Sequence, residues 1–224
     1  DWALNGKGLV LEYLERYADA LEAYRQAAAI KPNREWYWNN QGNALLLLGR
    51  YDEALQALEK AVDIHPDYSH SWALIAQTHR ALGQYSAALE AAQTATRTDR
   101  SNARAWNEVG IINEQMGDFD AALKAYERAA RYSPDKQAYL YKQADVLILL
   151  HRYREALDLL DEALTISNRN AYIWAKHAQA LRKLNRLQEA LTSYTKAVEL
   201  DPTYAWAWSG RGLTLSLLAK HDDA

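Results

Sequence analysis

Apolar residues recur along this chain in stripes that have helical spacing. Along the stretches of 34 residues, apolar or small side chains predominate at positions 4, 8 and 11, and again at positions 17, 20, 21, 24, 27, 28 and 30. His79 and Asn113, both at position 11, are polar exceptions. Residues three to four apart share one face of an α-helix, so each stripe predicts one amphipathic helix with a single buried face. Every stretch therefore predicts a pair of helices.

These stretches follow one another with a fixed period and without insertions. Counted from the first residue, the units are 1–34, 35–68, 69–102, 103–136, 137–170 and 171–204, with an incomplete seventh at 205–224. Position 20 is alanine in every unit, and all four prolines fall at position 32. Such a period is typical of repeat proteins, in which each unit buries its apolar face against the next. We expect a single solenoid domain over residues 1–224. Because the sequence starts without methionine and stops within a unit, we also expect it to be a fragment of a longer chain.

The turn between the two predicted helices falls at position 15. The residues found there are Gly49, Gly83, Gly117 and Asn185 in four units, and Glu15 and His151 in the other two. Glycine and asparagine tolerate the left-handed conformation that commonly ends a helix. Glu15 and His151 tolerate it less well, so we expect those two turns to be strained or to differ in shape.

Large and small residues occupy fixed positions of the unit. Position 8 is always glycine or alanine in the six complete units, and positions 20 and 27 are alanine, which lets neighbouring helices approach closely. Position 4 is tryptophan in five units: Trp38, Trp72, Trp106, Trp174 and Trp208. We expect these side chains to fill the space between units, so that replacing a buried Trp106 by alanine would cost about 3–5 kcal/mol.

The combined pattern of tryptophan, Gly or Ala, an aromatic residue, then Ala-x-x-x-Phe/Tyr-x-x-Ala and proline resembles the tetratricopeptide repeat. The resemblance covers all 224 residues. It implies an all-α fold, a right-handed superhelical solenoid of antiparallel helix pairs, in which first helices line a concave groove and second helices form the convex back. It also implies a non-catalytic scaffold that binds a peptide segment or a partner protein in that groove.

The sequence departs from that family at position 7, which is usually aliphatic there. Here only Ile75 and Val109 are aliphatic. The other units have Lys7, Gln41, Gln143, His177 and Arg211 at this position. We expect the stems of these long side chains to cover the apolar stripe while their polar heads reach water.

The resemblance implies that positions 2, 5, 6, 9, 12 and 13 of the first helices face the groove. The candidate partner-binding residues at these positions are Trp2, Trp36, Asn39, Asn43, His70, Gln77, Arg80, Arg104, Asn107, Tyr141, Lys142, Asp145, Tyr172, Lys176, Gln179 and Trp206. Exposed aromatic rings are typical of interface hot spots, because they bury much area at little entropic cost. The alternative is that these rings pack on the preceding loop, for instance on Tyr68 or Tyr204.

The polar residues of the groove also have two interpretations. Asn39, Asn43 and Gln77 could hydrogen-bond the backbone of an extended peptide, because an amide is both donor and acceptor. Alternatively, they form a solvated polar face. Basic residues gather toward the C-terminal end, which favours an acidic segment unless these charges are simply solvated.

Two ligand types bound by similar arrays are disfavoured. A clamp for the C-terminal carboxylate of a chaperone would need lysine, asparagine and a basic residue where Asn39, Leu74 and Glu108 stand, although two other positions match. A ladder of asparagines at position 6, as in the sugar-transferase relatives, has only Asn40 in place. A more general peptide groove is compatible with the sequence.

Composition and motifs exclude several other classes. A net charge of −3 with interleaved signs gives no general attraction to nucleic acid or to anionic lipid. No apolar run approaches the ~20 residues needed to span a membrane. The histidines lack metal-ligand spacing and no nucleophile motif is present, so we expect no enzyme activity, metal or cofactor. The absence of cysteine suits the reducing, cytoplasmic compartment.

Two further interpretations stay open. The array could sense a small molecule or a peptide and control an effector domain elsewhere in the parent chain, using the same groove. The seventh unit lacks its second helix, so the stripe that contains Leu213, Leu217 and Leu218 loses part of its cover. We expect this last helix either to fray or to stack end to end with another copy of the chain.

Overall fold

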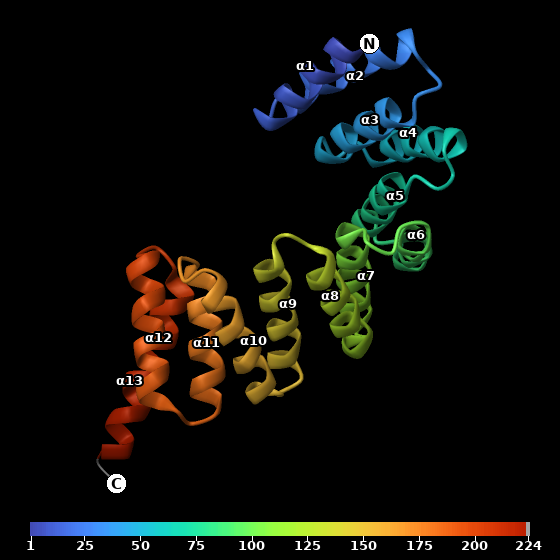
Figure 1. Cartoon of the computed structure of the whole chain (residues 1–224). Helices are drawn as coiled ribbons and strands as arrows, with labels where there is room; N and C mark the ends of the chain where they lie inside the picture. Colours follow the sequence, from blue (N-terminus) through green and yellow to red (C-terminus); the bar gives the residue numbers. More distant parts are fainter. Residues whose placement is uncertain (223–224) are drawn as a thin grey trace. The chain divides into compact units, whose positions relative to one another are not determined.

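The protein is helical throughout the part that the structure, a computed structural model, describes: the backbone of residues 1–222 and the side chains of residues 1–219 (Figure 1). The helices are α1 (Trp2–Tyr13), α2 (Tyr17–Ile30), α3 (Glu35–Leu47), α4 (Tyr51–Ile64), α5 (Ser69–Ala81), α6 (Tyr85–Thr98), α7 (Ala103–Met116), α8 (Phe119–Tyr132), α9 (Lys136–Leu149), α10 (Tyr153–Ile166), α11 (Ala171–Lys183), α12 (Leu187–Leu200) and α13 (Ala205–Asp222). No strand occurs among these residues. The predicted all-α solenoid of antiparallel helix pairs is confirmed, with two helices in each complete repeat.

The repeat determines where each helix begins and ends. All six second helices, from α2 to α12, span positions 17 to 30 of their units. Position 15 has a positive φ in every complete repeat, +73° at Gly49 and +58° at both Glu15 and His151. Glu15 and His151 therefore form turns of the same left-handed type, and their side chains make that conformation strained rather than different in shape.

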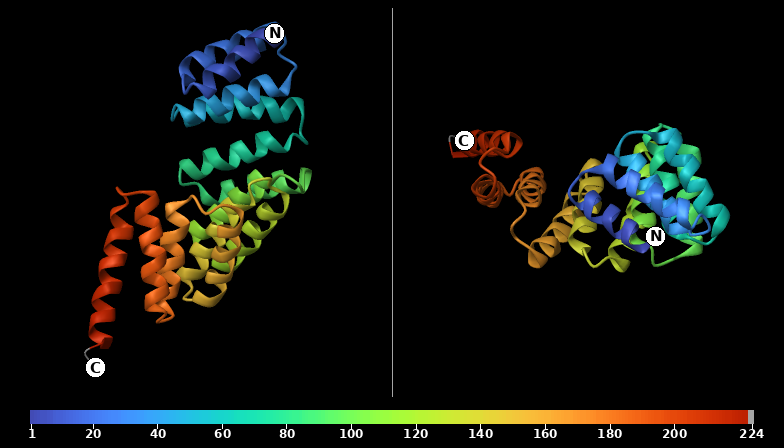
Figure 2. Two further views of the ribbon diagram at one scale, coloured as in Figure 1. Left: turned by 60° about the vertical axis from the view of Figure 1, so that its left-hand side comes forward. Right: turned by 90° about the horizontal axis from the view of Figure 1, so that it is seen from above.

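The chain divides into two compact units, Asp1–Asp118 and Phe119–Ala224. The division falls inside the fourth repeat, between α7 and α8. Unit 1 contains α1 to α7 and unit 2 contains α8 to α13, and within each of them successive helices lie side by side (Figure 2). One continuous solenoid over residues 1–224 remains a prediction, and Ala224, at position 20 of the seventh repeat, lies outside the described residues.

Small residues at position 8 allow the two helices of a repeat to approach closely. An added Cβ at Gly8 would lie 2.3 Å from the ring of Tyr24, and at Gly42 it would lie 2.4 Å from Leu58. Tyr24 and Leu58 occupy position 24 of the same repeats and are fully buried. The space that glycine leaves is therefore filled by the second helix.

The tryptophans of position 4 link each repeat to the end of the preceding one. Each indole N–H donates a hydrogen bond of 2.7–2.9 Å to the backbone carbonyl at position 32 of the preceding repeat. The pairs are Trp38 with Pro32, Trp72 with Pro66, Trp106 with Arg100, Trp174 with Asn168 and Trp208 with Pro202. Trp106 is half-buried rather than buried, because its indole edge lies over this connection instead of inside the core.

Position 7 behaves differently from the expectation. Gln41 and Gln143 are only 5% and 8% exposed, so the prediction that their polar heads reach water is wrong. Residues of the second helices before and after each of them flank these glutamines on both sides. His177 at the same position is half-buried, with Nε2 2.9 Å from Asp161 and Nδ1 2.9 Å from Ser193. Lys7 is exposed, as expected.

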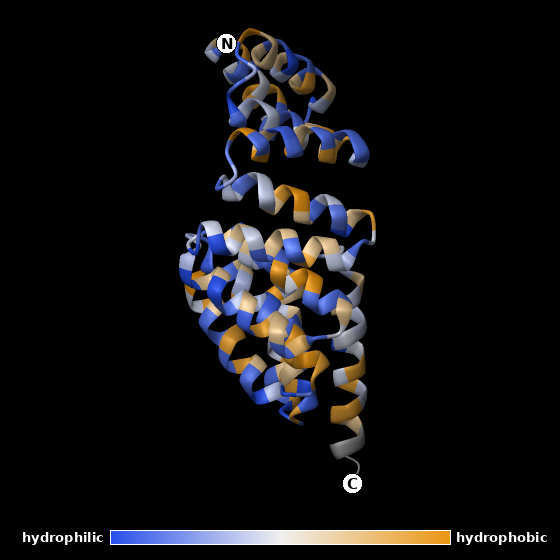
Figure 3. Ribbon diagram, turned by 90° about the vertical axis from the view of Figure 1, so that its right-hand side faces the viewer, coloured by the Kyte–Doolittle hydropathy of each residue, from blue (hydrophilic) through white to orange (hydrophobic). Residues whose placement is uncertain are grey.

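Hydrophobic and hydrophilic residues alternate along the helices of both units (Figure 3). In unit 2, Leu140, Leu160 and Ile173 belong to one buried cluster that extends over successive repeats. None of the described helices combines the length and the apolar character that crossing a membrane requires.

Candidate functional site

The predicted groove residues lie on the first helices, which are α1, α3, α5 and α7 in unit 1 and α9, α11 and α13 in unit 2. We call positions 2, 5, 6, 9, 12 and 13 of these helices the first-helix face. The side chains on this face form different contacts in the two units, and each unit is therefore described separately.

In unit 1, a chain of hydrogen bonds connects polar residues of three first helices. Ser71 Oγ donates to Asn39 Oδ1 at 3.0 Å, and Asn39 Nδ2 donates to Asn40 Oδ1 at 3.3 Å. Asn40 Nδ2 in turn donates to Asn5 Oδ1 at 2.9 Å. Asn39 is only 9% exposed, so its amide mainly joins neighbouring repeats and offers little surface to a peptide.

Asn43 is engaged in the same way. Its Nδ2 donates to Glu12 Oε1 at 2.6 Å, and Glu12 Oε2 accepts a hydrogen bond of 3.1 Å from the phenol of Tyr24. Burial, together with the Glu12 carboxylate, raises the pKa of Tyr24, so the phenol stays a donor. Glu12 was not among the predicted residues, although its place at position 12 of a first helix was a signal for it.

The basic residues of unit 1 also have partners within the chain. Arg80 Nε lies 2.9 Å from Oε2 of Glu108, whose side chain is 5% exposed. Arg104 donates to Gln77 Oε1 at 2.8 Å. Because a buried carboxylate is costly without a cation beside it, Arg80 is required to stabilise Glu108.

The predicted aromatic residues of unit 1 differ in exposure. Trp2 is 74% exposed, whereas Trp36 is half-buried against the edge of Tyr37, with ring centroids 5.9 Å apart. His70 stacks on Tyr68 at 5.4 Å, which is the packing that the alternative interpretation proposed. The last predicted residue of this unit, Asn107, is half-buried.

In unit 2, five predicted residues from three successive first helices form one connected group, the aromatic cluster: Tyr141, Asp145, Tyr172, Lys176 and Trp206. The rings of Tyr141 and Tyr172 meet edge to face with centroids 5.6 Å apart. The Tyr172 phenol donates a hydrogen bond to Asp145. The Lys176 ammonium lies 5.0 Å from the centroid of the Tyr172 ring and 5.4 Å from that of Trp206.

Charge within the aromatic cluster is balanced. The Lys176 ammonium lies 3.0 Å from Asp145 Oδ1 as an ion pair, without the direction of a hydrogen bond. Burial and the hydrogen bond to Asp145 raise the pKa of Tyr172. The Tyr172 phenol therefore remains a protonated donor, and the cluster presents apolar rings around a neutralised pair.

One edge of the aromatic cluster is open. Trp206 is 39% exposed, and it stacks on Tyr204 with ring centroids 6.0 Å apart. Tyr172 and Tyr204 also border a cavity of about 500 Å³ whose other walls include Leu200 and Asp201. A side chain of a bound segment could occupy this cavity while its neighbours cover Trp206.

The two remaining predicted residues of unit 2 are Lys142 and Gln179. The Lys142 ammonium lies 5.6 Å and 5.9 Å from the ring centroids of Tyr126 and Tyr139. Gln179 is half-buried, and no described residue donates a hydrogen bond to its Oε1. Asp145 neutralises Lys176, whereas the rings beside Lys142 are neutral and leave its charge in place.

The structure does not assemble a metal centre within its described residues, where no group of three or more histidine or acidic side chains could hold an ion. What the aromatic cluster offers chemically is a rigid, largely apolar surface with one fixed ion pair.

Solved structures share this architecture. A chain of the crystal structure of the APC/C hetero-tetramer Cut9-Hcn1 superposes with a TM-score of 0.76 at 16% identity, covering 95% of this chain and 42% of that one. PilF of Pseudomonas aeruginosa gives a TM-score of 0.74 at 17% identity, covering 84% and 86% of the two chains. YrrB, described as a TPR protein with an unusual peptide-binding site, gives 0.68 at 16% identity, covering 86% and 99%. At such identities the likeness concerns the fold alone.

Comparison with curated proteins gives no significant match. Profiles described as Tetratricopeptide repeat match residues 5–69 and 114–171 in one case and residues 45–107 in another, and a profile described as TPR repeat matches residues 178–218. The first of these profiles alone matches more than half of the chain. Together with the helix pairs of 34-residue period, these matches show that the chain belongs to the tetratricopeptide repeat family.

Proposed function

We propose that this protein binds a segment of a partner protein across the first-helix face of unit 2, with the aromatic cluster at the centre of the contact. Proteins of this family generally mediate protein–protein interaction and are typically non-catalytic scaffolds. The observation that carries the proposal is the convergence of α9, α11 and α13 on one group of rings beside a cavity of about 500 Å³.

The composition of the aromatic cluster suggests the kind of segment. Rings such as Trp206 bury much apolar area on binding and have few rotatable bonds to immobilise. Because Asp145 already neutralises Lys176, an acidic segment would gain little there. We therefore propose an apolar or aromatic anchor that lies against Trp206 and Tyr141. The peptide-binding site of YrrB, which has the same fold, supports a peptide as the ligand.

The test begins with a phage-displayed library of random peptides selected on the whole chain. The tightest peptide is labelled, and its affinity is measured by fluorescence anisotropy for the native chain and for Trp206→Ala. Removing a hot-spot ring is expected to cost about 2 kcal/mol or more of binding free energy, which is a loss of about 30-fold in affinity. Tyr132→Ala is the matched control, because Tyr132 is a 43% exposed aromatic residue on a second helix of the same unit.

An affinity that Trp206→Ala leaves within about twofold of the native value, or that both variants reduce equally, would place the contact elsewhere. The sensing alternative uses the same face and predicts the same loss. It differs in requiring an effector domain whose activity responds to the peptide.

A second proposal concerns contact between copies of the chain through α13. Leu215 at position 11 is 46% exposed, whereas Leu147 and Leu181 at the same position are 4% and 1% exposed. Trp208 is also 46% exposed. No described helix covers this face, and α13 remains helical through Asp222, so we propose that it pairs with α13 of a second copy rather than frays. Sedimentation velocity over a range of concentrations tests this contact. If the native chain is a monomer at every concentration and sediments like the Leu215→Glu variant, the contact is excluded.

A further inference from the structure

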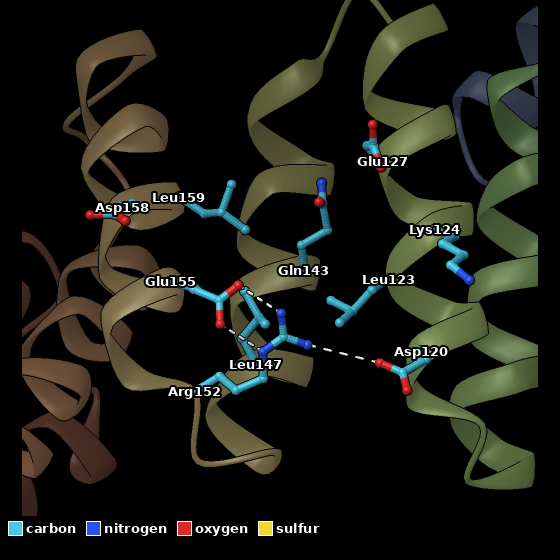
Figure 4. A pocket seen from close by; sticks show the side chains of 10 residues that line it. All are labelled: Asp120, Leu123, Lys124, Glu127, Gln143, Leu147, Arg152, Glu155, Asp158 and Leu159. Atoms are coloured by element: carbon cyan, nitrogen blue, oxygen red, sulfur yellow. Dashed lines mark hydrogen bonds and ion pairs between the residues drawn. The ribbon is translucent and has the colours of Figure 1, made fainter.

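Unit 2 has a second cavity on the side of α9 that is turned away from the aromatic cluster. Gln143 is two residues from both Tyr141 and Asp145, and Leu147 is two residues after Asp145; two residues correspond to a turn of about 200° around the helix. Together with Leu123 and Leu159, they form the floor of a cavity of about 490 Å³ between α8, α9 and α10 (Figure 4). We call it the second-helix cavity, because α8 and α10 form its walls.

The rim of the second-helix cavity is acidic. Four carboxylates line it, those of Asp120, Glu127, Glu155 and Asp158, against two bases, Lys124 and Arg152. Arg152 is already engaged, since it donates two hydrogen bonds of 2.7 Å and 2.6 Å to Glu155 and lies 3.8 Å from Asp120. Asp158 has neither a hydrogen bond nor an ion pair within the described chain. Glu127 is also paired, with the Arg131 guanidinium 3.3 Å from its Oε1. Four carboxylates against two bases at the rim still leave the cavity with an excess of negative charge.

Gln143 places an unused acceptor in the floor. The side chain is 8% exposed, and its Nε2 donates to the Tyr139 carbonyl at 3.3 Å. Its Oε1 accepts no hydrogen bond from the described residues. Because this acceptor lines the cavity, a ligand that brings N–H groups there could donate a hydrogen bond to it.

Unit 1 shows how the same repeat positions can be filled. A smaller cavity of about 210 Å³ lies there over Gln41 and Leu45, which occupy the same positions as Gln143 and Leu147. Arg25 of α2 borders it and reaches across to α4, where its guanidinium nitrogen lies 3.6 Å from Glu53 Oε2. In unit 2, the position of Arg25 is taken by Glu127, while the acid corresponding to Glu53 is kept as Glu155. Unit 2 thus keeps the acidic partner and lacks the arginine.

We propose that the second-helix cavity binds an arginine side chain presented by a partner protein. The aliphatic stem would lie on Leu123 and Leu159, and the guanidinium would face Asp158, Glu127 and Gln143 Oε1. Arginine fits better than a compact ammonium, because its five donors lie in one plane and its stem is apolar. This site is separate from the proposed contact at the aromatic cluster, since the two lie on opposite sides of α9.

The experiment uses the whole chain labelled with ¹³C in the leucine methyl groups. The probe is the peptide acetyl-Ala-Arg-Ala-amide, and its matched control has citrulline in place of arginine, which keeps the shape and removes the charge. The arginine peptide is expected to shift the methyl signals of Leu123, Leu147 and Leu159 until they saturate, more weakly in high salt because part of the attraction is screened. The citrulline peptide is expected to leave them in place.

The double variant Glu127→Gln with Asp158→Asn is expected to weaken binding of the arginine peptide by about 2- to 30-fold, which is the range for two exposed charges. Glu162→Gln on α10 is the control for a carboxylate outside the cavity. Equal shifts with citrulline, unchanged affinity in the double variant, or no shift at all would overturn the proposal.

Trp206→Ala separates this proposal from the proposed function. It should not affect binding of the arginine peptide, and the double variant should not affect binding of the peptide selected by phage display. If Trp206→Ala lost binding of the arginine peptide, the two sites would not be independent.

Discussion

The phenol of Tyr172 donates a hydrogen bond to the carboxylate of Asp145, which lies one repeat earlier on the neighbouring first helix. The same carboxylate holds Lys176, so one acid orders a ring and a cation in the aromatic cluster. Asp145 thereby fixes the geometry of the surface that we propose to bind a partner.

Replacing Tyr172 by phenylalanine removes this hydrogen bond and keeps the ring. Because the acceptor is charged and three-quarters buried, we expect the free energy of unfolding to fall by about 1.5 kcal/mol. Urea denaturation followed by circular dichroism measures it. Tyr132→Phe is the control, since that phenol makes no hydrogen bond within the described chain, and an equal loss there would contradict the assignment.

Stability should decrease at alkaline pH through the buried tyrosines. Burial and neighbouring acids raise the pKa of Tyr24 and Tyr172 above their ordinary value of 10.0. The folded state then holds these protons more tightly than the unfolded state, so their stabilising effect is complete below pH 10 and is lost as the pH rises toward the folded pKa. Urea midpoints on either side of pH 10 test this.

The Tyr172→Phe variant should show a smaller decrease between those two pH values than the native chain. A steeper decrease in the variant would mean that another group controls the alkaline transition.

Alanine at Gly42 should destabilise the protein, because its Cβ would lie 2.4 Å from Leu58. We expect overpacking to lower the free energy of unfolding by about 1–3 kcal/mol. Gly212→Ala is the opposite case, since nothing lies within 4 Å of its added Cβ. There alanine should raise the free energy of unfolding by about 0.5–1 kcal/mol, because it is the better helix former. Thermal unfolding of both variants measures the difference, and a loss of the same size at both sites would exclude the packing explanation.

Two variants separate the contribution of the indole hydrogen bond at position 4 to stability from that of the packed ring. Trp72→Phe keeps a ring but loses the 2.7 Å bond to the Pro66 carbonyl, and we expect a cost of about 0.5–1.5 kcal/mol from that bond. Trp2→Phe should change stability by less than about 0.5 kcal/mol, because Trp2 is exposed and its indole makes no hydrogen bond within the described chain. Denaturant titration distinguishes the two, and equal effects would show that only ring size matters.

The helices could be predicted closely because each depends on its own residues. The apolar stripes and Gly49 determine where the helices of one repeat begin and end, and repetition makes the pattern visible six times. The burial of Asn39 could not be predicted, since it depends on Ser71 arriving from the next repeat. The second-helix cavity was missed for the same reason, because three helices contribute to it and no single stretch of sequence contains its pattern.

The indole hydrogen bonds at position 4 also allow the opening of individual repeat boundaries to be followed by NMR spectroscopy. Five of the eight tryptophans have their N–H bonded to the preceding connection, and exchange of a bonded proton with solvent reports on the opening of its bond. Each bonded tryptophan therefore reports on one boundary between repeats, and the sequence in which these signals exchange would show where the array first opens. The boundary between the fourth and fifth repeats gives no such signal, because the fifth repeat has Leu140 instead of tryptophan at position 4.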